Sequence, residues 1–475
     1  MEKQTSFAKR ILNAGSWSVV GYGAGQVIRF GSNLILTRLL YPEAFGIMAI
    51  IQAVMTGLVM LSDFGIPHYI IRREREPEPD FLNTAWTVQI FQGILIGIIF
   101  SVIPPLVASF YSEPLIAQIM PIVGLNAVIS GFNSTKTATL SRQISIKTTI
   151  IFELITAFTG TAIIIIFAWL MHSVWALVWG FLAGTMVRML ASHAMLEGIR
   201  HRIAWHKNYV RELVDFGKWI IVRSSLTFVD GEGNKLIMGA FLGVRTLSFF
   251  NLASTMNLMV SQLVQAISGR LLIPVYSEIL RERPARINAV LAKCRLVFIG
   301  SGWLAAIFFI ILGKKFMGFL FDPRYADSGK ILQVLAMGSL LGNLNGSYSH
   351  LLTAMGRIRA STFLLIIKIV VQLACIFTGY YLFGEGGVIF GVALGEWLYY
   401  PLNTFYYARI GFWQPKIDLP FLAFSLIIIS LMALYSDVFQ LLFEDRGHEA
   451  DFLQFMFSWY EKGLSGLEYI LKYFR

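Results

Sequence analysis

The sequence predicts an all-α polytopic membrane protein, built as two pseudo-symmetric six-helix bundles plus about one extra span and a C-terminal amphipathic helix. The prediction depends on the composition, on regularly spaced apolar segments and on a weak internal repeat. Of the 475 residues, 56% are hydrophobic and only 14% are charged, and the mean hydropathy is +0.65. Soluble domains carry about 25% charged residues, so an ordinary soluble fold is excluded.

Apolar segments of roughly 20 residues, the length that crosses the hydrocarbon core of a bilayer, recur along the whole chain. The links between them are short, which leaves no room for a large soluble domain. We expect domains at 1–205 (first bundle), 206–410 (second bundle) and 411–475 (extra span and tail). The expected spans are about 16–40, 44–66, 83–105, 115–134, 149–170, 174–196, 215–243, 248–273, 295–313, 331–355, 360–383, 388–408 and, as a thirteenth, 419–437.

The tail after the thirteenth span mixes apolar and charged residues. Phe452, Phe455 and Trp459 are interleaved with charges such as Glu461 and Lys462. This pattern favours a helix that lies in the membrane interface over a fourteenth span.

Basic residues predict the orientation and account for the net charge of +11. With the N-terminus in the cytoplasm, about 22 Lys and Arg residues fall in inner loops and about 6 in outer loops. A nucleic-acid partner is therefore not needed to explain the charge. Cys294 and Cys375 lie in no metal or redox spacing, and no Walker-type glycine-rich run occurs. We expect no disulfide, no metal site and no cofactor.

An internal repeat suggests the two bundles. Residues 33–49 (NLILTRLLYPEAFGIMA) align with residues 235–251 (KLIMGAFLGVRTLSFFN), each with an apolar run, a short turn and a second apolar run. Transporters often contain such repeats, with the binding site between the halves. Chance similarity between two apolar segments is the alternative.

A polar stripe follows the first span. Its members are three or four residues apart and therefore share one helix face. An arginine near the centre of a membrane helix costs at least ~2.5 kcal/mol on insertion scales, which indicates a function for Arg29. Arg38 falls on the opposite face, at the end of the span, where it can reach the headgroups. The stripe consists of Ser18, Tyr22, Gln26, Arg29, Asn33 and Thr37.

Three other spans carry comparable polar faces. In span seven the run VDGEGNK (229–235) predicts unwound backbone, which is tolerated at this depth only inside protein or beside water. The faces contain Gln52, Thr56 and Asp63 in span two; Arg223, Thr227, Asp230 and Asn234 in span seven, with Glu232 nearby; and Ser254, Asn257, Ser261, Gln265 and Ser268 in span eight, followed by Arg270.

Together the stripes predict a water-filled cavity with cationic walls between the two halves. The planar fork of arginine donates two parallel hydrogen bonds to phosphate, and amide and hydroxyl groups suit sugar hydroxyls. The Ser and Thr residues are better explained as hydrogen-bonding contacts between helices. The candidate ligand-binding residues are Tyr22, Gln26, Arg29, Asn33, Arg188, Arg223, Asn257, Gln265, Arg270 and Lys368; Asp63, Asp230, Glu232 and Glu396 either couple an ion or pair with these cations.

Four segments carry a family resemblance: LTRLLYPEAFGIMAI (36–50), LSDFGIPHYIIRREREPEPDFLNTAW (61–86), LLIPVYSEILRE (271–282) and LLTAMGRIRASTF (351–363). They resemble the polysaccharide transporter (PST/Wzx-like) family of the multidrug/oligosaccharidyl-lipid/polysaccharide exporter superfamily. The resemblance covers roughly residues 5–410, and the pattern around Asp63, Gly65 and residues 82–85 is its most specific part. It implies two six-helix bundles arranged as a V around a central cavity.

The resemblance also implies a function. Members of this family are flippases that move undecaprenyl-diphosphate-linked oligosaccharide units across the bacterial inner membrane by alternating access, for exopolysaccharide, capsule or O-antigen assembly. The implied partners are that lipid-linked substrate, membrane lipids, and polysaccharide polymerase and export machinery.

Two alternatives remain. A drug/cation antiporter of the same superfamily would favour carboxylates over arginines in its cavity. A membrane polysaccharide polymerase or ligase would need a larger outer loop with catalytic groups, whereas His68, His172 and His350 are scattered without nucleophile partners. We expect no enzymatic activity.

Overall fold

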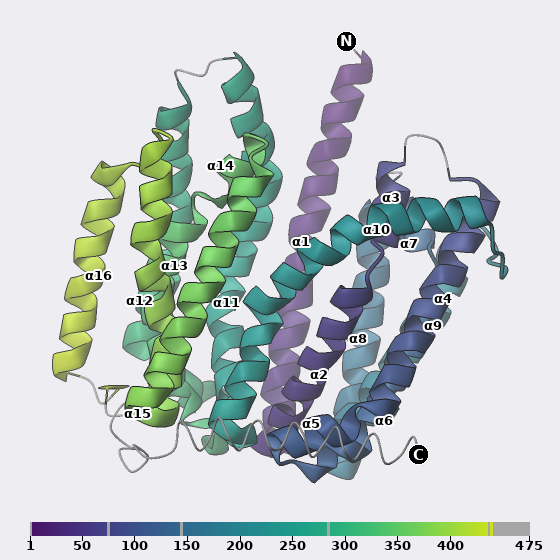
Figure 1. Ribbon diagram of the computed structural model, residues 1–475, viewed down its shortest axis with the longest axis horizontal. Coiled ribbons are helices and arrows are strands. Elements are labelled where there is room, and N and C mark those ends of the chain that lie inside the picture. Colours follow the sequence, from purple (N-terminus) through teal and green to yellow (C-terminus); the bar gives the residue numbers. More distant parts are fainter. Residues whose placement is uncertain (1, 74–76, 143–145, 283–285, 436–437, 440–475) are drawn as a thin grey trace. The chain divides into compact units, whose positions relative to one another are not determined.

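The computed structural model describes residues 2–73, 77–142, 146–282, 286–435 and 438–439. These residues form helices and no strand (Figure 1). Nine helices in this part of the chain are long and apolar enough to cross a membrane. Two of the nine, Ser224–Met259 and Ile358–Arg409, each contain a turn and cover two of the predicted spans in part or in full. The predicted spans at 16–40 and 331–355 have no counterpart among the nine. The all-α polytopic fold is confirmed, while the predicted amphipathic tail lies outside the described residues.

Contacts divide the chain into two compact units, one reaching Leu236 and the other beginning at Ile237. The unit boundary follows helix α10 (Lys207–Phe228), which packs against helices of the first unit. The expected bundle boundary at residues 205 and 206 reflects a symmetric division of twelve spans and stays a prediction.

The described part of unit 1 contains six long helices and three short ones besides α10 (Figure 1). Five of them have proline in the first turn, where its missing N–H is no loss. Helices α4 and α6 approach closely through glycine: a Cβ on Gly131 would lie 3.1 Å from the carbonyl oxygen of Gln89. The helices are α1 (Glu2–Leu39), α2 (Pro42–Ser62), α3 (Ile66–Arg72), α4 (Pro79–Val102), α5 (Pro104–Tyr111), α6 (Pro114–Gly131), α7 (Lys136–Arg142), α8 (Ile146–Met171) and α9 (Val174–Ala194).

Unit 2 is organised around α13 (Ser328–Gly346), most of whose residues are buried and which packs against α12, α15 and α16. Gly384, with a φ of 61°, divides α15 into two antiparallel halves. Gln372 Nε2 of the first half donates to the carbonyl oxygen of Val392 in the second, at 3.2 Å. The other helices are α11 (Asn234–Glu282), α12 (Ile287–Leu320), α14 (Ser349–Ala354), α15 (Ile358–Arg409) and α16 (Pro415–Tyr435).

The run 229–235 is helical, so the prediction of unwound backbone there is wrong. Val229–Gly233 forms a π-helical turn, η1, that connects α10 to α11. A π turn accommodates an extra residue while the backbone groups keep intrahelical partners. Backbone hydrogen bonding is the stronger requirement within a membrane.

The two aligned repeat segments share a local geometry. In the first, α1 ends at Leu39 and Tyr41 has a ψ of 153° before α2 begins. In the second, the aligned Gly243 turns the chain with a φ of 65° and a ψ of 169°. The leucines that precede these turns, Leu40 and Leu242, are both buried. This agreement supports the sequence alignment.

The linker between α9 and α10, residues 195–206, has no regular secondary structure but is held against unit 1. Lys136 Nζ donates to the carbonyl oxygens of His193 and Leu196, at 3.0 and 2.8 Å. His201 Nε2 accepts from the backbone N–H of Thr135 at 3.2 Å, and the His201 ring stacks on Trp86 with centroids 5.2 Å apart. Because these contacts fix its course, the linker is a defined part of unit 1.

His201 should make unit 1 less stable as the pH is lowered. Burial, and then the neighbouring His193 and Lys136, lower the pKa of His201 from 6.5 to about 4. The folded state therefore disfavours a proton that the unfolded state accepts, so the stabilisation is complete above pH 6.5 and is lost as the pH falls towards 4. Thermal unfolding in detergent between pH 7.5 and 5 measures this effect. The His201→Gln variant should show a weaker pH dependence, and equal dependence in both proteins would contradict the assignment.

Candidate functional site

Helix α1 packs on α8 through one face and presents its polar stripe on another. A Cβ on Gly21 would press on the side chain of Ile150, and Ala24 and Ile28 line a shallow pocket with Phe158 of α8. At 100° per residue, the stripe lies roughly 150° around the helix axis from this packing face. The stripe therefore points away from α8.

The described stripe residues differ in exposure. Gln26 Nε2 donates to the hydroxyl of Tyr22 at 2.7 Å, and both side chains are half-buried. Thr37 is buried and donates to the carbonyl oxygen of Asn33 at 2.8 Å. Arg29 is exposed. An arginine with a neighbouring amide and phenol is thus available to an anionic, hydroxyl-bearing ligand, whereas Thr37 serves the helix itself. The side chain of Ser18 lies outside the described part.

Other candidates in unit 1 have local contacts. Arg188 is exposed, and its guanidinium carbon lies 5.9 Å from the ring centroid of Phe152. Asp63 Oδ1 accepts from the backbone N–H of Gly65 at 2.7 Å, which shapes the turn into α3. Glu232 pairs with Lys235 at 2.9 Å. The Asp230 carbonyl oxygen accepts from Asn234 Nδ2 at 2.9 Å. The carboxylate of Asp63 thus serves a turn and that of Glu232 an ion pair, beside any role in ion coupling, whereas the Asp230 contact involves only its backbone.

Unit 2 contains a polar network that includes two candidates. Lys368 Nζ lies 3.2 Å from Glu396 Oε1, and the two side chains are 29% and 21% exposed. Asn345 Nδ2 donates to Glu396 Oε2 at 3.2 Å, and Asn403 Nδ2 donates to Asn345 Oδ1 at 3.2 Å. The predicted cation and the predicted carboxylate are therefore brought together. This network connects α13 with both halves of α15.

No described contact joins the remaining candidates to the α1 stripe or to the Lys368–Glu396 network. Asn257 Nδ2 donates to Ser339 Oγ at 2.8 Å, which ties α11 to α13. The side chains of Arg223, Gln265 and Arg270 lie outside the part of the chain that the structure describes. Their roles stay predictions.

A buried ion pair in unit 2 was missed by sequence reasoning. Arg295 Nη2 of α12 lies 2.6 Å from Asp418 Oδ1 of α16, and both side chains are 0% exposed. Asp418 Oδ2 also accepts from the hydroxyl of Tyr348 at 2.9 Å and from Trp413 Nε1 at 3.1 Å. The guanidinium carbon lies 3.6 Å from the centroid of the Tyr348 ring. With so many partners and no exposure, this pair holds helices together and does not bind a ligand.

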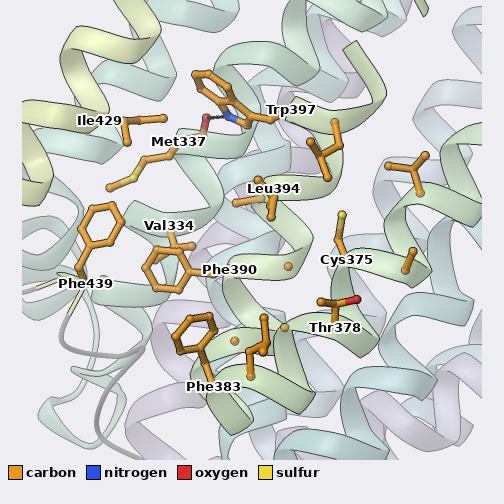
Figure 2. Close-up of a pocket in the computed structure, with 18 of the residues that line it drawn as sticks. Val334, Met337, Cys375, Thr378, Phe383, Phe390, Leu394, Trp397, Ile429 and Phe439 are labelled. Atoms are coloured by element: carbon orange, nitrogen blue, oxygen red, sulfur yellow. Dashed lines mark hydrogen bonds between the residues drawn. The ribbon is translucent and has the colours of Figure 1, made fainter. Parts of the chain in front are cut away.

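An apolar groove of about 740 Å³ is formed by α13, both halves of α15, α16 and Phe439. Figure 2 shows Val334, Phe383 and Phe390 along it, with Thr378 and Cys375 supplying a hydroxyl and a thiol. Trp397 Nε1 donates to the carbonyl oxygen of Met337 at 3.2 Å (Figure 2). The groove suits a hydrocarbon chain. It was not predicted, because its lining residues resemble ordinary lipid-facing or packed positions.

Comparison with known proteins gives the family. This chain is 20% identical over 404 residues to the lipopolysaccharide biosynthesis protein WzxC of Escherichia coli K12, covering 84% of this chain and 80% of that protein. It is also 20% identical to the succinoglycan biosynthesis transport protein ExoT of Rhizobium meliloti, covering 70% and 66%.

Among solved structures, the fold is similar to an inward-facing MATE family multidrug transporter of the MOP superfamily, with a TM-score of 0.67, 14% identity and coverage of 81% and 94%. It is also similar to the lipid II flippase MurJ, with a TM-score of 0.66, 12% identity and coverage of 98% and 100%. At these identities the likeness establishes the fold alone. Residues 35–330, more than half of the chain, match the family described as polysaccharide biosynthesis protein. The chain is thus a multi-pass membrane protein that belongs to the polysaccharide biosynthesis protein family.

Proposed function

We propose that this protein is a flippase for undecaprenyl-diphosphate-linked oligosaccharide units. It moves them from the cytoplasmic to the outer leaflet of the bacterial inner membrane by alternating access, with its own N-terminus in the cytoplasm. The polar stripe of α1 is the observation that supports the proposal, because it places exposed Arg29 on the same helix face as Gln26 and Tyr22, in a segment that the sequence predicts to span the membrane. The names of the relatives and the family membership agree with a glycan-related transport role.

Each part of such a substrate has a chemical counterpart in the chain. Arg29 supplies a bidentate donor for the diphosphate. Tyr22, Gln26 and Asn33 supply hydroxyl and amide groups for the sugars. The apolar groove of unit 2 suits the hydrocarbon of the lipid. Polymerase and export machinery would act on the product in the outer leaflet.

The membrane potential can drive this movement. Two negative charges that move outward across an inside-negative membrane gain about 2.3 kcal/mol per charge per 100 mV. ATP hydrolysis is therefore not required, and ion coupling would add to this driving force.

Reconstitution tests the proposal. The purified protein is placed in vesicles with lipid-linked oligosaccharide, a membrane potential is imposed, and an impermeant glycan-cleaving enzyme reports how much substrate has reached the outer leaflet. We expect the cleaved fraction to rise with wild-type protein and with the potential. Export of a cationic dye without movement of the lipid-linked glycan would instead establish the antiporter function.

The Lys368–Glu396 pair provides a separate prediction. Lys368→Met leaves Glu396 without its cation in a partly buried site and should lower the thermal unfolding midpoint by a few degrees. The double variant Lys368→Met/Glu396→Gln should recover most of this loss, as measured by fluorescence-detected unfolding in detergent. If the double variant unfolds as early as the single one, charge pairing is not the role of these residues.

A further inference from the structure

The linker between α9 and α10 exposes cations and large apolar side chains side by side. Arg200, Arg202 and Lys207 are exposed. Between them, Ile203 is 79% exposed and Trp205 is 53% exposed. In water, two large apolar groups on a loop would be unfavourable, so their environment needs an explanation.

Contacts with α4 fix how far along this helix the linker residues lie. The backbone N–H of Arg202 donates to Asn83 Oδ1 at 3.0 Å, and that of Ala204 donates to Thr87 Oγ1 at 3.1 Å. The Trp205 ring then meets the Phe91 ring edge-on, with centroids 5.5 Å apart. From Asn83 to Phe91 the helix advances about 12 Å. The Trp205 ring therefore lies further along α4 than the neighbouring Arg202. Ile203 and Trp205 together are called the apolar tip of the linker.

The linker then returns towards the start of α4. His206 Nδ1 lies 3.2 Å from Thr84 Oγ1, one residue from the position where Arg202 is held. Arg202 and Lys207 thus flank the apolar tip on both sides, at the level of the first turns of α4. The linker is a hook with a charged rim and an apolar tip, and its backbone is held in this shape by side chains of the helix.

The surface beside the tip belongs to a membrane span. Phe91 is 59% exposed, and Leu95 and Ile98 on the same side of α4 are 53% and 56% exposed. All three lie in a helix that is long and apolar enough to cross the bilayer. Tryptophan is enriched where membrane meets water, and each lysine or arginine near an anionic leaflet contributes about 1 kcal/mol.

We propose that residues 200–207 form a membrane-interface hook that binds anionic phospholipid. Arg200, Arg202 and Lys207 contact the headgroups, and Ile203 and Trp205 enter the acyl-chain region beside α4. The hook anchors the first unit at the connection between α9 and α10. This inference needs only a multi-pass membrane protein, so it stands or falls independently of the flippase proposal.

Lipid counting tests the headgroup contacts. The full-length protein is released from nanodiscs of phosphatidylcholine with phosphatidylglycerol, and the retained phosphatidylglycerol is measured by native mass spectrometry. Arg200→Gln/Arg202→Gln/Lys207→Gln should lower its affinity by roughly fivefold for each cation removed. The matched control is Arg281→Gln/Arg357→Gln/Arg359→Gln, three exposed arginines elsewhere, which should retain most of the lipid. Equal loss of phosphatidylglycerol in both variants would mean that only the net charge of the protein matters, and would overturn the proposal.

Spin-label depth tests the position of the tip directly. In a background with Cys294 and Cys375 replaced by alanine, a label at Ile203→Cys is compared with one at Lys207→Cys in nanodiscs. The label at position 203 should be more accessible to oxygen and less accessible to a water-soluble nickel chelate. Greater nickel accessibility at position 203 than at position 207 would place the tip in water and overturn the hook.

Discussion

Replacing Arg29 with alanine is expected to abolish movement of lipid-linked oligosaccharide while the protein remains folded in the membrane. The arginine is exposed on a face of α1 that points away from α8, so its removal leaves the helix packing intact. A hydrogen bond to a charged group contributes about 1.5–3 kcal/mol, so losing a two-pronged contact should slow transport by roughly a hundredfold or more, to the background rate. The vesicle assay measures the rate, and size-exclusion chromatography in detergent verifies folding.

Two further variants make this result specific. Arg29→Lys keeps the charge but loses the planar fork, so it should transport at an intermediate rate. Arg38→Ala removes a cation from the same helix on the opposite face and should transport nearly normally. Full activity of Arg29→Lys would indicate that only charge balance matters, and normal transport by Arg29→Ala would remove Arg29 from the binding site.

Breaking the buried Arg295–Asp418 pair should cause the largest loss of stability. Each single variant, Arg295→Met or Asp418→Asn, leaves the other group in a fully buried site without its main partner. Removal of one member of a buried pair costs about 3–5 kcal/mol, so we expect little folded protein and a markedly lower unfolding temperature.

The double variant Arg295→Met/Asp418→Leu should recover much of that stability, because buried pairs are often replaceable by apolar residues of similar volume. As a control, Lys218→Gln removes a pair with Asp215 in which both side chains are more than half exposed, and should change stability little. Unfolding temperatures in detergent decide the outcome. A stable Arg295→Met single variant would contradict the assigned role.

Sequence analysis predicted the features that follow from the spacing of residues along the chain. The stripe on α1 follows from residues three and four apart, and the helical fold follows from the apolar segments. The partnership of Lys368 with Glu396 was one of two stated alternatives, and only the hairpin at Gly384 brings these residues together.

Contacts between distant segments could not be predicted. Arg295 and Asp418 stand at the edges of two separate apolar runs, each two residues after a lysine, and their partners, Tyr348 and Trp413, give no signal in one sequence. Residues 82–85 were identified as part of the most specific family pattern, but their structural role was not predicted. Asn83 and Thr84 contact a linker that comes more than a hundred residues later.

The Arg295–Asp418 pair also has a consequence for experiments on topology. Helix α16 lies beyond the residues that match the family, and it would be an obvious place to shorten the protein or fuse a reporter enzyme. A fragment ending near residue 410 would leave the buried guanidinium group of Arg295 without its carboxylate. Reporter fusions at that position would then record the behaviour of a damaged second unit, whereas fusions placed after Tyr435 would keep the native anchor.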